Sequence, residues 1–433
     1  MPSQPLDYES IPFIDDGGDS LAFREDASSV LQASSNLIKV ILGAGMFYLP
    51  FACASMGWAA IALMVLFGCI ALYSMSLIAE CVDVVYENKP SWTSISFADL
   101  GQAAFGSTGR TLCSVSIVIE FTLAAVSMLI NIAVNINSIF ESCSLTSGIL
   151  LASIITYLLC HINNLNHFSY LSACGNSVVL VSIAILVISG IQCMRLSSDL
   201  TSHKLLDLSG VPSSMGLVAF CYGGVGAYPK IYMSLETSSD NYKMLIISGF
   251  VIIGTYSSVA FVGYYFFGDQ TKIPVTSNIG FDQNGNDLQL GLLERSIAAL
   301  GVAFNMQVTV PLILFTLRDI LVPSSSGSVA LDSFKNTASL ILVFICMSAA
   351  MVFHSHFSAL CSLVGSACTT LNSVCLPIAF HHRLFKDSLS WPRVCLHTFI
   401  LLVVVSSSLL GIASNFCRVL EDHTGICSFL SAH

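Results

Sequence analysis

Long apolar runs recur along the chain at a spacing that suits helices crossing a membrane. From residue 28 almost to the C-terminus, apolar stretches alternate with short polar connections. About 20 apolar residues, rising 1.5 Å each, span a hydrocarbon layer of about 30 Å. The pattern predicts an all-α integral membrane protein. We place its eleven transmembrane helices at residues 28–56, 57–82, 112–140, 147–161, 168–192, 209–235, 243–267, 289–321, 334–353, 357–381 and 394–413.

Two of these runs are interrupted in the same way. The first contains LGAGMFYLP and the sixth FCYGGVGAYP, each a glycine cluster followed by a proline. Matched interruptions at corresponding positions of two halves indicate an inverted-repeat transporter with its site near the membrane midplane. Helices 1–5 and 6–10 would then form a 5+5 repeat, with helix 11 added. The alternative is that the glycines only allow close helix packing.

Unwound backbone at membrane depth is tolerated only where it is buried in protein or lines a wet cavity. The amides after Gly45 begin a half-helix, whose positive end suits a carboxylate, and the carbonyls at 222–224 suit an ammonium group. We therefore expect a small zwitterion to bind here. The predicted contacts are Leu42, Gly43, Ala44, Gly45, Tyr222, Gly223, Gly224 and Val225.

The third run carries a polar stripe. Glu120 lies among apolar residues, where an ionisable group indicates function because its burial costs at least ~2 kcal/mol. Ser127, Asn131 and Asn135 follow at helical spacing. An inward-facing stripe would line a substrate or proton pathway, and desolvation would favour the neutral form of Glu120, which suits a proton carrier. For the asparagines the alternative is hydrogen bonding to neighbouring helices.

Other polar residues carry weaker signals. Asn305 and Gln307 in the eighth run could contact substrate, but packing is the favoured interpretation. His381 and His382 end the tenth run, where exposed interfacial histidines need no function. Histidine spacing suitable for a metal and a nucleophile–base arrangement are both missing from the sequence. We expect no metal, no cofactor and no enzymatic activity.

Composition and charge support this picture. The chain of 433 residues is 55% hydrophobic and 10% charged, against about 25% charged in soluble proteins, and its mean hydropathy is +0.80. Residues 1–27 are polar and acidic and are expected to form a disordered cytosolic tail, followed by the transmembrane domain at 28–413 and a non-cytosolic tail at 414–433. This orientation puts eleven Lys and Arg near cytosolic ends and five on the other side, as the positive-inside rule requires. We expect a monomer in the lipid bilayer with no nucleic-acid partner.

Most of the 16 cysteines fall inside apolar runs, where a thiol behaves as a small hydrophobic group. Cys143 and Cys193 differ, because both lie in predicted non-cytosolic loops that can be oxidised. A disulfide bond between them and two separate thiols are equally compatible with the sequence.

At these residues the chain resembles the amino acid/auxin permease family, and within it the vacuolar amino acid transporters of plants and fungi and the vesicular inhibitory amino acid transporters. The resemblance runs from about residue 28 to residue 268. Besides LGAGMFYLP, it rests on FADLGQAAFGSTGR, NNLNHFSYLSACG, FCYGGVGAYPKIYMSL and VGYYFFGD.

The resemblance implies a leucine-transporter-like fold that moves amino acids by alternating access, commonly with protons, and it places the family's helix-3 glutamate on Glu120. Val225 stands where relatives commonly have histidine, and Asn131 where they have an acidic residue. Helix 6 then offers no proton acceptor beside its break, so coupling would use another group, for which Glu120 is the candidate, or be absent.

We therefore expect proton-coupled secondary active transport of neutral amino acids, as symport or antiport. The expected location is a vacuolar, lysosomal or other endomembrane, with the plasma membrane as the other possibility. The alternative function is an amino acid sensor that binds its ligand without transporting it.

Overall fold

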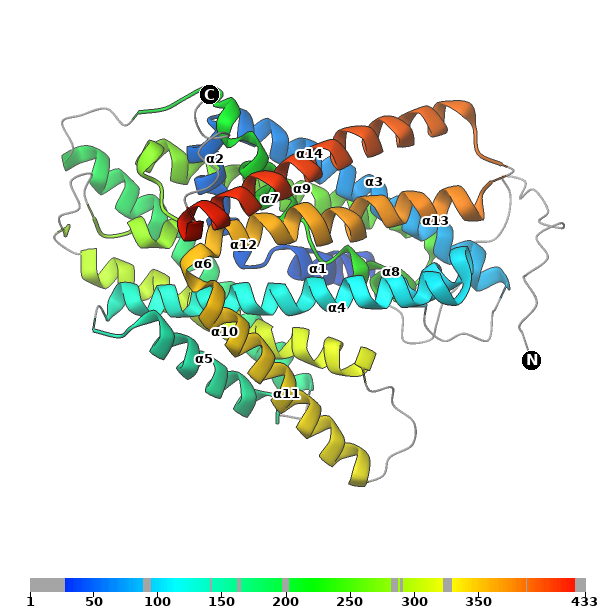
Figure 1. Cartoon of the computed structure of the whole chain (residues 1–433), viewed down its shortest axis with the longest axis horizontal. Coiled ribbons are helices and arrows are strands. Elements are labelled where there is room, and N and C mark those ends of the chain that lie inside the picture. Colours follow the sequence, from blue (N-terminus) through cyan, green and yellow to red (C-terminus); the bar gives the residue numbers. More distant parts are fainter. Residues whose placement is uncertain are drawn as a thin grey trace.

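The computed structural model describes residues 28–88, 95–140, 142–161, 165–196, 202–281, 287–288, 291–321, 329–386 and 388–424 (Figure 1). Within these ranges helices joined by turns make up the fold, and the β pairings are two isolated bridges, Ser28 with Leu235 and Phe281 with Asp287. The predicted all-α class is confirmed. The predicted cytosolic tail, 1–27, lies outside the described residues.

Fourteen α-helices follow one another through the described part of the chain. In order, α1 to α14 are Val30–Ile41, Leu49–Met56, Ala59–Asn88, Phe97–Ile139, Leu145–Leu159, Leu165–Leu196, Val211–Cys221, Tyr228–Met233, Asn241–Phe267, Gly291–Leu321, Val329–Phe353, Phe357–Val364, Leu376–Leu384 and Trp391–Thr424. Each of the eleven predicted segments corresponds to one helix or to one interrupted pair. The pairs are α1 with α2, α7 with α8, and α12 with α13.

Length and composition give fewer candidate membrane crossings in the described part than the eleven predicted helices. Eight helical runs of the described part are long and apolar enough to cross a membrane, or nine if the bent pair α1–α2 counts as one span. α5 has only 15 residues, and Asn336–Leu384 forms one run of 49 residues that turns at the 3-10 segment His354–His356. In Figure 1, α11 leaves the bundle at an angle to α12 and α13. The chain is a multi-pass membrane protein, and the count of eleven stays a prediction.

The first predicted helix is broken at its glycine cluster. α1 starts with a capping box formed by Ser29 and Gln32, and after it the 3-10 turn Ala44–Tyr48 leads into α2. The two halves of the segment meet at an angle of 46°. Pro50 lies in the first turn of α2, where a missing N–H breaks no helical hydrogen bond. The proline therefore starts the second half-helix.

The sixth predicted helix is broken in a similar way. α7 ends at Cys221, and Gly224 has φ of +94°, a left-handed conformation that glycine adopts without steric cost. The 3-10 turn Val225–Ala227 then leads into α8, with Pro229 in its first turn. Both glycine-proline signals predicted from the sequence therefore mark real interruptions.

Two further helices shape the space between these breaks. α4 spans 43 residues with a kink at Gly106, whose φ is +69°; it runs along the bundle in Figure 1 and packs against α5, α10 and α11. The tenth segment contains two π-turns, Gly365–Thr369 and Leu371–Cys375, between α12 and α13. A π-turn is rare and is often found at a functional site.

The last helix corrects one predicted boundary. α14 continues to Thr424, beyond the predicted end at residue 413. Neither glycine nor proline interrupts the sequence between 413 and 424, so nothing stops the helix there. The first part of the predicted non-cytosolic tail is thus helical, and residues 425–433 lie outside the described part.

Candidate functional site

A cavity of about 290 Å³ lies where the two breaks meet. Its wall comes from both interrupted segments, from α4, from α10 and from the first π-turn of the tenth segment. Small-molecule pockets commonly have volumes of ~300–1,000 Å³, so this cavity suits a small ligand. The largest part of its surface is apolar, with Lys39, Glu120, Asn305 and Thr369 among its polar side chains.

Five of the eight predicted substrate contacts line this cavity: Leu42, Gly43, Gly45, Gly223 and Gly224. Two further predicted contacts, Tyr222 and Val225, are described by the structure and are not part of the lining.

Tyr222 turns away from the cavity, since its hydroxyl donates to the Met64 carbonyl at 2.9 Å. Val225 is buried against the core with 1% of its surface exposed. Ala44 begins the 3-10 turn of the first break. The sequence located the breaks correctly but not which residue of each break borders the cavity.

The glycines of the breaks differ in the space around them. At Gly45 an added Cβ would lie 2.8 Å from Cys221 Sγ, which itself donates to the Gly45 carbonyl at 3.2 Å. At Gly43 the nearest atom to such a Cβ is the Ile41 carbonyl oxygen, 4.0 Å away. Gly45 therefore allows the two segments to touch, whereas Gly43 has room beside it that a ligand can fill.

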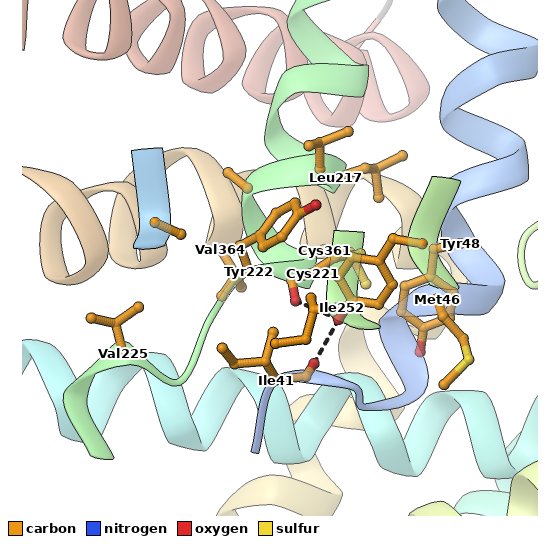
Figure 2. Packing of buried hydrophobic residues seen from close by; sticks show 14 of the residues in the cluster. Ile41, Met46, Tyr48, Leu217, Cys221, Tyr222, Val225, Ile252, Cys361 and Val364 are labelled. Atoms are coloured by element: carbon orange, nitrogen blue, oxygen red, sulfur yellow. Dashed lines mark hydrogen bonds between the residues drawn. The ribbon is translucent and has the colours of Figure 1, made fainter. Parts of the chain in front are cut away.

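A tyrosine from α9 joins the two breaks. The Tyr256 hydroxyl lies 2.6 Å from the Ile41 carbonyl oxygen and 2.8 Å from that of Cys221, the bonds drawn as dashed lines in Figure 2. Ile41 and Cys221 are the last residues of α1 and α7, where helical carbonyls lack a partner within the helix. Tyr256 thus fixes both half-helix ends, and the hydrophobic pattern of α9 gave no signal for this role.

Glu120 borders the cavity and is held from another helix. Its side chain is 4% exposed; Thr369 donates to Oε1 at 3.0 Å and Asn372 donates to Oε2 at 2.6 Å. An added Cβ on Gly223 would lie 3.2 Å from Oε1, so the sixth segment touches the carboxyl as well. The prediction of a buried carboxyl in the third helix is confirmed as geometry, and Thr369 and Asn372 are partners that the sequence did not reveal.

The rest of the predicted polar stripe lies outside the cavity lining. The Ser127 hydroxyl donates to the Leu123 carbonyl of its own helix at 2.9 Å. Asn131 Nδ2 donates to Tyr48 Oη at 2.5 Å, and Asn135 Nδ2 donates to Asn131 Oδ1 at 2.5 Å. These are the packing contacts that the sequence offered as the alternative for the two asparagines.

The weaker candidates separate clearly. Asn305 lines the cavity, where packing was expected. Gln307 does pack, donating to the Ala152 carbonyl at 3.1 Å and to Thr156 Oγ1 at 2.8 Å. His381, expected to be exposed, is fully buried, and its Nε2 lies 2.9 Å from Glu80 Oε2. The expectation failed because α13 packs on α3, which helix periodicity alone does not predict.

The two loop cysteines are not joined to each other. Cys143 Sγ lies 3.8 Å from the Ser144 carbonyl oxygen and 3.7 Å from Ser147 Oγ. Cys193 lies within α6, and 1% of its surface is exposed. The predicted loop position of Cys193 is therefore wrong, since α6 continues to Leu196.

The family described as "Transmembrane amino acid transporter protein" matches residues 26–419. Amino acid transporter AVT1B of Arabidopsis thaliana is 28% identical over 411 residues, covering 91% of this chain and 72% of that protein. Amino acid transporter ANT1 of the same plant is 27% identical over 402 residues, covering 87% of this chain and 90% of the relative.

Solved structures show the same fold at low identity. Mhp1 in an inward-facing conformation gives a TM-score of 0.62 at 11% identity, covering 95% of this chain and 93% of that one. A manganese transporter from Eremococcus coleocola gives 0.60 at 11% identity, with 91% and 88% covered. A sodium-coupled sialic acid symporter gives 0.57 at 12% identity, with 91% and 89% covered. The predicted leucine-transporter-like fold is confirmed.

Proposed function

Because the chain belongs to the transmembrane amino acid transporter protein family, we propose that it moves small neutral amino acids across an endomembrane by alternating access, driven by protons. One observation carries the proposal: a single cavity is bordered by both helix breaks and by a buried carboxyl. The breaks supply the recognition and Glu120 supplies the proton site.

Recognition of the substrate backbone falls to the half-helix ends. The 3-10 turns Ala44–Tyr48 and Val225–Ala227 start the second half of each broken helix, and the first amides of a helical turn point outward without a partner in that turn. Such amides favour a carboxylate. Carbonyls of the unwound residues accept hydrogen bonds from the substrate ammonium group, beside those already bound by Tyr256.

The apolar part of the cavity supports a neutral side chain. Phe121, Ala124 and Met128 from α4 and Leu312 and Ile313 from α10 line it. Burying a charged side chain against such a surface is costly without a partner. The volume of about 290 Å³ further favours small substrates.

Proton coupling rests on the place of Glu120. It borders the cavity, so a proton can reach it from the water that accompanies substrate, and its carboxyl is bound by the tenth segment and touched by the sixth. A change in its charge alters the contacts of both segments. The vacuole or lysosome is the proposed membrane, since its acidic lumen supplies a proton gradient; the family resemblance supports this placement.

The experiment is transport into proteoliposomes with an imposed pH difference. Wild-type protein should accumulate a labelled neutral amino acid. Glu120→Gln keeps the shape and hydrogen-bonding capacity of the side chain but cannot take up a proton, so it should exchange substrate at near wild-type rates while accumulation falls at least about tenfold.

Glu294→Gln is the matched control. Glu294 is also buried, with 9% of its surface exposed, but lies outside the cavity and accepts a hydrogen bond from Gln192 at 2.7 Å. The Glu294→Gln protein should accumulate substrate to the same level as the wild-type protein. A Glu120→Gln protein that still accumulates substrate would exclude Glu120 as the coupling group. Binding without any flux in wild type would favour the sensor.

A further inference from the structure

A second layer of polar side chains lies behind Glu120, away from the cavity. Asn372 reaches Glu120 with Nδ2, and its Oδ1 lies 2.7 Å from Ser116 Oγ. Ser116 Oγ also lies 3.0 Å from the Cys113 carbonyl oxygen. All three side chains are buried, Asn372 completely. The cluster therefore forms a line of hydrogen bonds from the carboxyl to the backbone of α4.

With Glu120 ionised, one direction of hydrogen bonding pairs a donor with an acceptor at each contact of the cluster. Asn372 Nδ2 donates to the carboxylate, and the Ser116 hydroxyl donates to Asn372 Oδ1. Thr369 donates to the other carboxylate oxygen. A carboxylate that accepts two such hydrogen bonds needs no further partner for its charge to be stabilised.

With Glu120 protonated at Oε2, the same atoms allow the reverse direction. The new O–H must donate, so the amide of Asn372 turns over and offers its oxygen instead of its nitrogen. The Asn372 N–H then donates to Ser116 Oγ, and the Ser116 hydroxyl turns to the Cys113 carbonyl, which is already within 3.0 Å. An amide and its reversed form occupy almost the same space. No heavy atom has to move far.

We infer that Asn372 and Ser116 form a proton-responsive relay, in which reversal of the Asn372 amide lets Glu120 take up or release a proton while the Glu120–Asn372 and Asn372–Ser116 contacts each keep one donor and one acceptor. The inference rests on the proposed role of Glu120 in proton coupling. Asn372 and Ser116 are positioning residues, because they act on the proton through Glu120. Two donors facing each other in a buried contact are costly, and the relay avoids that mismatch when Glu120 gains its proton.

The relay has a defined electrostatic setting. Three other titratable groups line the cavity with Glu120, namely Lys39 from α1, Tyr48 from the first break and Cys221 from α7. A fourth, Cys368 from the first π-turn, interacts electrostatically with Glu120. Of these four, Lys39 alone is charged near neutral pH. The other contacts of Glu120, through Thr369, Asn372 and Gly223, are neutral, so the relay compensates a proton change at Glu120 by reorienting dipoles.

The position of Asn372 gives the relay a route to the rest of the transporter. Thr369 and Asn372 belong to the two successive π-turns of the tenth segment. Thr369 also lines the cavity, whereas Asn372 does not. The tenth segment thus borders the cavity through Thr369 and binds the Glu120 carboxyl through Thr369 and Asn372, in neighbouring turns. Protonation of Glu120 therefore changes the hydrogen bonds of a segment that lines the substrate cavity.

Infrared titration of purified protein tests the relay without transport. The C=O stretch of a protonated carboxyl that disappears in Glu120→Gln reports Glu120, and its midpoint pH is measured in variants. Ser116→Ala removes the acceptor of the reversed amide, and a buried N–H tolerates that loss less well than a C=O, so the midpoint should fall by about half a pH unit. Asn372→Leu removes a donor to the carboxylate and should raise it by at least as much.

The relay predicts that the midpoint pH of Glu120 shifts in opposite directions in Ser116→Ala and Asn372→Leu. Ser127→Ala is the matched control: a buried serine of α4 whose hydroxyl donates to its own helix at Leu123, with no midpoint change expected. Equal shifts in both relay variants, or none, would overturn the relay. If Asn372→Leu does not fold, the direction of the midpoint shift in Ser116→Ala is the test, and a midpoint that does not fall contradicts the relay. If the midpoint pH shifts as expected in both variants but transport does not depend on pH, the relay is supported and the proposed proton coupling is wrong.

Discussion

Glu120 and Asn131 lie on the same face of α4, about three turns apart, in different surroundings. Glu120 borders the cavity and is bound by Thr369 and Asn372, more than 240 residues further along the chain. Asn131 is completely buried and is not part of the lining of this cavity. It is bound to Tyr48 and Asn135.

The Asn131 region joins three elements through uncharged groups. Tyr48 comes from the first break and packs edge-on against Phe357, with ring centroids 5.3 Å apart. Thr276, from the 3-10 turn after α9, donates to Asn135 Oδ1 at 2.9 Å. None of these groups changes charge near neutral pH, so the contacts hold these elements together without responding to a proton.

The difference between the regions shows how one polar stripe serves two purposes. A carboxyl beside a cavity can exchange a proton, whereas amides and hydroxyls sealed between helices can only hold those helices together. The cavity itself extends along α1 to Lys39 and along α10 to Thr316, away from the Asn131 region.

The largest effect on substrate binding is expected at Gly43, which borders the cavity. Gly43→Ala places a methyl group into the space beside the cavity, with no protein atom closer than 4.0 Å. We expect substrate affinity to fall at least about tenfold (~1.4 kcal/mol) with unchanged thermal stability. Gly45→Ala, whose Cβ would lie 2.8 Å from Cys221 Sγ, should instead lose about 1–3 kcal/mol of stability.

Gly254→Ala is the control for this pair, since nothing lies within 4 Å of its Cβ position and it is outside the cavity. Ligand binding and thermal unfolding are measured on the same detergent-solubilised samples. Equal losses of stability for Gly43→Ala and Gly45→Ala would mean that both glycines serve packing, and the cavity would lose its support as the binding site.

A substitution in the Asn131 region is expected to change stability alone. Asn131→Leu removes the donor to Tyr48 and the acceptor of Asn135. Hydrogen bonds between membrane helices contribute ~0.6–2 kcal/mol, so we expect the free energy of unfolding to fall by about 1–2 kcal/mol while substrate affinity changes less than twofold. Thermal unfolding and binding assays check both. A loss of affinity without a loss of stability would place Asn131 in the substrate pathway.

The interruptions could be predicted from sequence because their causes are local. Glycine clusters weaken a helix wherever they occur, and Pro50 and Pro229 mark where each second half begins. The buried carboxyl was also predictable, since Glu120 is conspicuous in an apolar run. Periodicity then placed Ser127, Asn131 and Asn135 on the same face, which is correct.

What each position of that face meets could not be predicted, because it depends on partners distant in sequence. Thr369 and Asn372 approach Glu120 across 249 and 252 residues, and Tyr256 approaches Ile41 across 215. No spacing rule within one helix encodes such pairs. The single stripe was therefore interpreted as one pathway, although only its first member borders the cavity.

The smallest expected effect concerns the charge of the cavity. This charge also distinguishes the cavity from the uncharged region around Asn131. Lys39 lies in the last turn of α1, where the helix dipole favours a cation, and it lines the cavity. Its ammonium group opposes a second positive charge on the substrate side chain. Two charges about 4 Å apart interact by ~1 kcal/mol even in a water-like medium, roughly a fivefold change in affinity.

Lys39→Met keeps the length and apolar stem of the side chain but removes its charge. We expect competition by a cationic amino acid, measured against uptake of a labelled neutral one, to strengthen roughly fivefold, while affinity for the neutral substrate stays within about twofold. Lys243→Met is the control, because Lys243 is exposed and pairs with Asp240 at 2.8 Å away from the cavity. If neutral substrates lose affinity and cationic ones gain none, the ammonium of Lys39 binds the substrate carboxylate instead of excluding cations. The cavity would then recognise charge at two points, the half-helix amides and Lys39, and the contrast with the uncharged region around Asn131 would become stronger.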